Sequence, residues 1–140
     1  MKRVSNFRDY VKINEYNSEP SEPSNMDKEI FWKFVRIADW KSDHDYERIK
    51  KLLKSKFRES YINKLQSVYD YYLNELSHRF ESDWLGEPGI PVGEDSWIDL
   101  RGDVIGRGEE FYKSITVEKL RKMAIEDDYK ECFGYSFNNI

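Results

Sequence analysis

The chain has 140 residues, with 27 acidic and 23 basic side chains and a net charge of −4 at pH 7. Its four tryptophans, ten tyrosines and eight phenylalanines supply enough buried area for one domain-sized core, at roughly 150–250 Å² per ring, which argues against disorder of the whole chain. The excess of acids argues against nucleic acid or an anionic membrane as the main partner, because both are polyanions.

The cysteine content and the composition of the first residues favour a reducing compartment. Cys132 is the only cysteine, so no internal disulfide can form. The opening MKRVSNFRDYVK lacks the apolar stretch of a secretory signal. No segment approaches the roughly 20 apolar residues that span a bilayer. We therefore expect a soluble, cytoplasmic protein with no membrane contact.

The first 25 residues differ in composition from the rest of the chain. Phe7, Val11 and Ile13 show a weak alternation, which fits a short strand or an ordered arm. Residues 17–25, NSEPSEPSN, contain two prolines and no apolar residue, the composition of an extended linker. The sequence therefore predicts a non-helical N-terminal arm and Pro/Ser linker over residues 1–25 and a helical domain over residues 26–140.

From residue 26 onward, apolar residues recur with the period of amphipathic helices. Asn25 or Asp27 can cap the first helix and Thr116 the last, and Gly108 is placed to stop a helix in a left-handed conformation. We predict a mostly α fold, a single compact bundle of about five to six helices. The expected helices cover residues 27–38, 43–57, 59–80, 96–107, 111–115 and 117–124.

Two segments interrupt this pattern. GEPGIPVGED, residues 86–95, holds three glycines and two prolines and predicts a loop. The end of the chain, DDYKECFGYSFNNI, is rich in rings but has no period. We expect this tail to lie over the bundle.

EDSWIDLRGDVIGRGEEFY, residues 94–112, is the richest stretch for chemistry. Gly102, Gly106 and Gly108 do not predict a phosphate loop, because they lie inside and after a helix, at the carbonyl end, which has the wrong polarity for an anion. Gly102 and Gly106 each cost stability in a helix interior. Close approach of another helix or of the aromatic tail would explain them structurally, and a backbone-lined groove would explain them functionally.

Asp95, Asp99 and Asp103 recur every four residues and can line one helical face. Three carboxylates could bind Mg²⁺ or Mn²⁺. In the simpler interpretation the face is solvated: Asp95 caps the helix, Asp99 lies near its positive end and Asp103 pairs with Arg107. We favour the solvated face, and the metal site stays an alternative.

No set of residues predicts catalysis. His44 and His78 are the only histidines, and neither lies in a pattern typical of a general base. With Cys132 the chain has three Cys and His residues, too few and too scattered for a structural zinc site. Cys132 lies among aromatics and is expected to be a small buried hydrophobe. We predict no catalytic residue and no cofactor.

The segment 48–58 contains the one basic cluster of the chain. Its apolar residues sit at helical spacing, so the cations fit lysines that flank a buried row. A weak nucleic-acid contact through this segment is a second alternative. The cluster comprises Lys50, Lys51, Lys54, Lys56 and Arg58.

Several of these elements, in order, resemble the bacterial family of uncharacterised proteins known as domain of unknown function 4240. They are DKEIFW at residues 27–32, Trp84, Gly93 to Asp95, and the run from Ser96 to Tyr112 with its Arg-Gly and Gly-Tyr steps. The resemblance covers about residues 26–135. Leu100 and Asp103 depart from the pattern, which more often has aromatic residues there. The resemblance implies a mostly helical cytoplasmic domain and supplies no catalytic residue.

The absence of a catalytic pattern and the excess of rings and acids favour a non-enzymatic module that recognises another protein. An acidic protein that masks a basic target, as immunity proteins do, is one version, and a regulator is another. The loop from Gly86 to Asp95 and the helix after it are the expected contact region. The candidate contact residues are Glu94, Asp95, Trp97, Asp99, Arg101 and Arg107. The main alternative is a metal-dependent or anion-binding enzyme that uses Asp95, Asp99 and Asp103, with Arg101 or Arg107 binding the anion.

Overall fold

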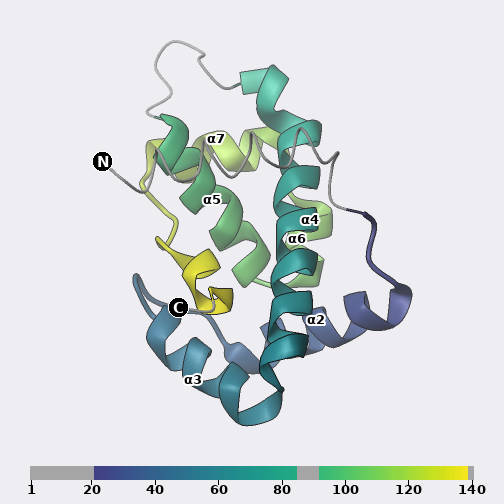
Figure 1. Ribbon diagram of the computed structural model, residues 1–140. Coiled ribbons are helices and arrows are strands. Elements are labelled where there is room, and N and C mark those ends of the chain that lie inside the picture. Colours follow the sequence, from purple (N-terminus) through teal and green to yellow (C-terminus); the bar gives the residue numbers. More distant parts are fainter. Residues whose placement is uncertain (1–20, 85–91, 139–140) are drawn as a thin grey trace.

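The computed structural model describes residues 21–84 and 92–138 (Figure 1). Within these ranges the chain forms six α-helices and one 3-10 helix and no strand, which confirms the predicted helical bundle. The predicted arm over residues 1–20 and the loop over residues 86–91 lie outside the described residues. The helices are α2 (Asn25–Ala38), α3 (Tyr46–Lys56), α4 (Glu59–Trp84), α5 (Glu94–Gly106), α6 (Glu109–Ser114), α7 (Val117–Ile125) and the 3-10 helix η1 (Phe133–Phe137).

Local side-chain chemistry sets several helix ends. Thr116 caps α7, as predicted, by accepting a hydrogen bond of 3.2 Å from the backbone N–H of Lys119. The prediction that Asn25 or Asp27 caps the first helix is wrong. Ser24 has the extended backbone that a capping residue needs, and its Oγ accepts from the N–H of Asp27 at 3.1 Å. The sequence predicts that Gly108 stops the fourth helix in a left-handed conformation. The structure has Arg107 as the C-cap of α5 and Gly108 as the N-cap of α6, with a φ of +113° that favours glycine and a ψ of 169° outside the left-handed helical region.

The long helix α4 is the element around which the others are packed (Figure 1). Leu65, Val68 and Leu76 are buried on α4, which contacts α2 and α5 most extensively. Rings from three helices meet at Tyr72 of α4, whose centroid lies 4.8 Å from that of Trp32 and 5.0 Å from that of Tyr112. Offset and edge-to-face contacts of this kind each add about 0.5–1.5 kcal/mol to simple burial.

The tail enters the core instead of lying over it. Phe133 and Phe137 of η1 are both fully buried. The ring of Phe137 stacks on Tyr69 of α4 at 5.3 Å and on Phe31 of α2 at 5.5 Å. Because η1 also contacts α3 and α5, the end of the chain joins four helices into one core.

The glycines of α5 are explained by close packing. A methyl group at Gly106 would lie 2.6 Å from Cδ1 of Trp40 and 3.0 Å from the ring of Phe133. A methyl group at Gly102 would lie 2.9 Å from the hydroxyl oxygen of Tyr69. The sequence allowed either close packing or a backbone-lined groove as the reason for these glycines. The structure supports close packing, by Tyr69 of α4 on Gly102 and by Trp40 and Phe133 on Gly106.

Candidate functional site

The charged residues predicted to face water on α5 lie in the protein interior. Asp99, Arg101 and Asp103 are only 7%, 5% and 1% exposed. The prediction of a solvated acidic face is therefore wrong for Asp99 and Asp103. The reason is that α4 packs on one side of α5 while η1 and α7 pack on others, so little of the helix surface remains for solvent.

Asp103 joins three separate parts of the chain. Its Oδ1 accepts a hydrogen bond of 2.8 Å from Nε1 of Trp40, and its Oδ2 accepts one of 2.7 Å from Nε of Arg107. The backbone N–H of Lys130 donates to the same carboxylate. Burial raises the pKa of Asp103 above its ordinary value, and the Arg107 charge and the donated hydrogen bonds oppose that rise. The predicted pair between Asp103 and Arg107 is confirmed.

Asp99 and Arg107 hold the segment that leads into η1. Oδ1 of Asp99 accepts from the backbone N–H of Cys132 at 3.1 Å, and Nη2 of Arg107 donates to the carbonyl oxygen of Asp128 at 2.9 Å. Together with Asp103, these side chains bond the backbone at three positions of the tail. The acids of α5 therefore serve to fix the tail against the core.

Arg101 connects α5 to the middle of α4. Its Nη1 donates to the carbonyl oxygen of Leu73 at 2.9 Å and to Oγ of Ser77 at 2.6 Å. Its guanidinium carbon lies 5.1 Å from the ring centroid of Trp97, within the range of a cation–π contact. The interior position of Arg101 leaves this cation unavailable to an anionic ligand in solution.

The structure separates the predicted contact residues into two groups. Glu94 is exposed and Asp95 is half-buried, and both lie in the first turn of α5. The prediction that Asp95 caps this helix is wrong, because Gly93 is the N-cap and no side chain caps the helix. Trp97, Asp99 and Arg101 are buried, where a docked protein cannot reach them, and Arg107 is bonded to Asp103 and the tail. The loop that was expected to complete this surface lies largely outside the described residues.

The aspartates of α5 do not assemble a metal centre. Asp99 and Asp103 accept hydrogen bonds from different parts of the interior. Across residues 21–84 and 92–138, no group of three or more His, Cys, Asp and Glu side chains is placed to hold a metal ion. The alternative of an enzyme that works through Asp95, Asp99 and Asp103 thus gains no support from their geometry.

The two histidines lie on the surface, and Cys132 is buried as predicted. His44 adopts a φ of +60°, and its Nε2 lies 3.6 Å from a carboxylate oxygen of Glu131. The backbone N–H of Glu131 in turn donates to Oδ1 of Asp43 at 2.8 Å. This loop between α2 and α3 thus forms one more attachment for the tail.

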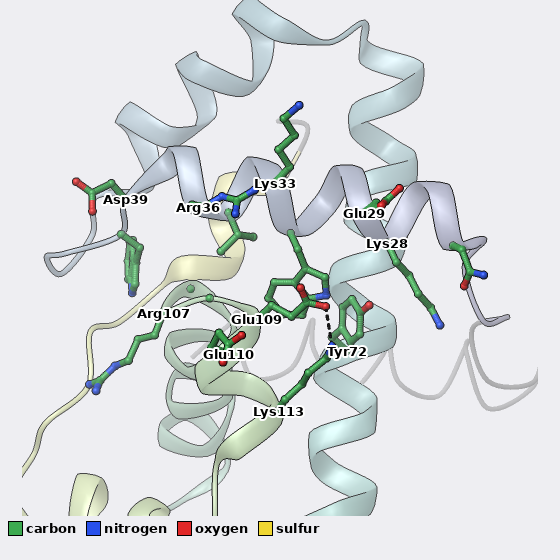
Figure 2. A pocket seen from close by; sticks show the side chains of 16 residues that line it. Lys28, Glu29, Lys33, Arg36, Asp39, Tyr72, Arg107, Glu109, Glu110 and Lys113 are labelled. Atoms are coloured by element: carbon green, nitrogen blue, oxygen red, sulfur yellow. Dashed lines mark ion pairs between the residues drawn. The ribbon is translucent and has the colours of Figure 1, made fainter.

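A groove of about 810 Å³ opens between α2 and the corner where α5 meets α6 (Figure 2). Its floor is formed by the edges of Trp32, Trp40 and Tyr72, which are each less than a tenth exposed. Figure 2 shows the side chains of α2 on one side of the groove and those of α6 on the other. The charged side chains of the two walls are Lys28, Glu29, Lys33, Arg36 and Asp39 on the α2 side, and Arg107, Glu109, Glu110 and Lys113 on the α6 side.

Some of these charges are paired within the protein and some are not. Glu109 and Lys113 form an ion pair of 3.2 Å on the α6 wall. Among the described residues, Lys33, Arg36 and Glu110 form no ion pair, and all three side chains are exposed. Glu29, on the α2 wall, is likewise exposed and forms no ion pair among the described residues. The groove therefore offers two cations and an acid on the α2 wall and an acid on the α6 wall for pairing with another molecule.

No local pattern in the sequence predicts this groove. On α2 the charged residues follow the spacing of an ordinary solvated helix face, and Glu109 and Glu110 look like favourable acids in the first turn of a short helix. Only the tertiary approach of α2 to α6 brings them to one place.

Comparisons with protein-family models, with curated proteins and with solved structures give no match for this chain. None of the helices in the part of the chain that the structure describes is long and apolar enough to cross a membrane. Membership of the family named above remains a prediction. The groove and the exposed charges must therefore be interpreted from their own geometry.

Proposed function

We propose that this protein is a non-enzymatic interaction module that binds a segment of another protein in the groove between α2 and α6. The observation that carries the proposal is the presence of unpaired charges of opposite sign on the two walls, Arg36 and Lys33 on α2 and Glu110 on α6. Because the aromatic floor of the groove is nearly buried, recognition of the partner depends more on the charged side chains of the two walls than on contact with the floor.

Charge complementarity defines the partner. A matching segment places an acidic side chain beside Arg36 and a basic side chain beside Glu110, and these two contacts favour one orientation of the segment across the groove. Exposed pairs of this kind contribute about 0.2–1 kcal/mol each, which suits a specific but reversible contact. This preferred orientation distinguishes the proposal from a general affinity for basic or acidic proteins.

Site-specific photo-cross-linking tests the proposal. A photoreactive amino acid is placed at position 36, at position 110, or at the control position 64, which is exposed on α4 and lies outside the groove. After irradiation in extract of the native host, positions 36 and 110 are expected to capture the same protein, and position 64 is not.

Charge reversal then shows whether the captured protein uses the groove. Arg36→Glu is expected to reduce cross-linking from position 110 about two- to fivefold, the loss of one exposed ion pair. The matched control Lys64→Glu leaves it unchanged. Capture of unrelated proteins from the two groove positions, or equal sensitivity to both reversals, would overturn the proposal.

The setting of this module is part of the proposal. We propose that the protein acts in the cytoplasm, a location that the single cysteine favours. We also propose that it acts as an immunity protein or as a regulator. Membership of the family of unknown function 4240 is likewise proposed, on the motifs between residues 27 and 112.

A further inference from the structure

The region around α3 carries a charge opposite to that of the whole molecule. Residues 46–58 contain six basic side chains and one acid, a net charge of +5, in a chain whose total is −4. Five of these cations are exposed, and the four that form no ion pair among the described residues are called the basic face below. They are Lys51, Lys54, Lys56 and Arg58.

Internal ion pairs do not account for the basic face. None of its four members pairs with an acid in the described part of the chain. Arg48, in contrast, is bound to Asp45 at 2.7 Å. Lys54 and Lys56 lie in the last turn of α3, where they stabilise the helix dipole, but Lys51 and Arg58 lie outside that turn. Interaction with the helix dipole therefore accounts for at most two of the four cations of the basic face.

Two partly exposed rings, which also pack against the core, are close to these cations in the sequence. Phe57 separates Lys56 from Arg58, and Tyr61 follows one turn later, with ring centroids 5.4 Å apart. The hydroxyl of Tyr61 donates to Oδ1 of Asp27 at 2.7 Å, which fixes the orientation of the ring. Cations interleaved with rigid rings are the arrangement by which proteins hold single strands, through phosphate contacts and base stacking.

We propose that the basic face and the rings of Phe57 and Tyr61 bind single-stranded nucleic acid. The rings favour this ligand over an acidic polypeptide, whose carboxylates gain nothing from an aromatic surface. The net negative charge of the protein does not prevent binding, because at physiological salt the screening length is about 8 Å and distant acids are screened. This inference rests on observations independent of the groove.

Fluorescence anisotropy with a labelled single-stranded 12-nucleotide RNA of mixed sequence tests the inference. Binding at 50 mM salt is expected to weaken with a slope of about −3 in a plot of log K against log salt, for four phosphate contacts. The variant Lys51→Glu/Lys54→Glu/Arg58→Glu is expected to bind at least ten times more weakly. A control with the same change of net charge, Lys41→Glu/Lys64→Glu/Lys122→Glu, is expected to change affinity less than threefold.

Two further measurements distinguish binding of single-stranded nucleic acid from binding of an acidic polypeptide. Phe57→Leu is expected to weaken RNA binding several-fold with an unchanged salt slope, because a stacking surface is lost while the cations remain. A poly-glutamate peptide of 12 residues is expected to bind at least ten times more weakly than the RNA. No binding of RNA at 50 mM salt, equal losses in the two triple variants, or equal affinity for poly-glutamate would overturn the inference.

Discussion

The indole Nε1 of Trp40 donates a hydrogen bond of 2.8 Å to Oδ1 of Asp103, a residue 63 positions later in the chain. This bond ties the loop after α2 to the centre of α5, and the same carboxylate binds Arg107 and the backbone of Lys130. A single interior carboxylate thus fixes the geometry of one wall of the groove and of the tail. Removal of this carboxylate should therefore lower the stability of the whole domain.

Asp103→Ala is expected to lower the free energy of unfolding by about 3–5 kcal/mol, because it leaves the buried Nε1–H of Trp40 and the Nε–H of Arg107 without their acceptor. Asp95→Ala, eight residues earlier at a half-buried position, should cost only about 0.3–1 kcal/mol through the helix dipole. Urea denaturation measures both. Similar losses for the two variants would contradict the interior role of Asp103.

Acid should affect the wild type and Asp103→Asn differently. The pKa of Asp103 is raised in the folded protein, chiefly by burial, so the folded state binds the proton more tightly than the unfolded chain does. The contribution of this residue to stability therefore grows as the pH falls through the raised pKa. The difference in unfolding free energy, wild type minus Asp103→Asn, is expected to increase between pH 7 and pH 4. A decrease over that range would show that the pKa is lowered instead.

Gly106→Ala is expected to destabilise the protein by about 1–3 kcal/mol, the usual cost of overpacking a core. The added methyl group would meet Trp40 and Phe133, two rings that are themselves held by the core. Gly93→Ala is the control, because nothing lies within 4 Å of its added carbon, and its cost should stay below about 1 kcal/mol. Thermal and chemical denaturation of the two variants compare these costs directly.

The tail should behave as a core element in mutagenesis. Phe133→Ala is expected to lower the free energy of unfolding by about 3–5 kcal/mol, since the ring is fully buried. Phe111→Ala removes a partly exposed ring that covers Arg107 at 4.9 Å, and about 1 kcal/mol should be lost. If the two variants were equally stable, η1 would be a surface cover and not part of the core.

Helical period predicted the elements of this fold well, because helices such as α2, α3 and α7 bury one stripe of apolar residues and that stripe is visible in the local sequence. The cap at Thr116, the positive φ of Gly108 and the burial of Cys132 also followed from local chemistry. The burial of Asp99 and Asp103 did not follow from the local sequence. Acids four residues apart look the same on a solvated face and on a buried one.

Two non-local facts decide the difference. Asp103 accepts a hydrogen bond from Trp40, and Asp99 accepts one from the backbone N–H of Cys132. The sequence of α5 alone does not predict either donor. The groove has the same origin, since its walls lie on helices about 70 positions apart in the sequence. Of the residues singled out on α5, Trp97, Asp99, Arg101 and Asp103 lie in the interior, whereas Glu94 is exposed.

Amide hydrogen exchange at Cys132 tests most directly whether the acids of α5 hold the tail. Its N–H donates to Asp99 inside the protein, so the account predicts strong protection in the wild type and a loss of protection at Cys132 in Asp99→Ala, while amides in the middle of α4 stay protected. A Cys132 amide that exchanges freely in the wild type, or that keeps its protection in Asp99→Ala, would contradict the account.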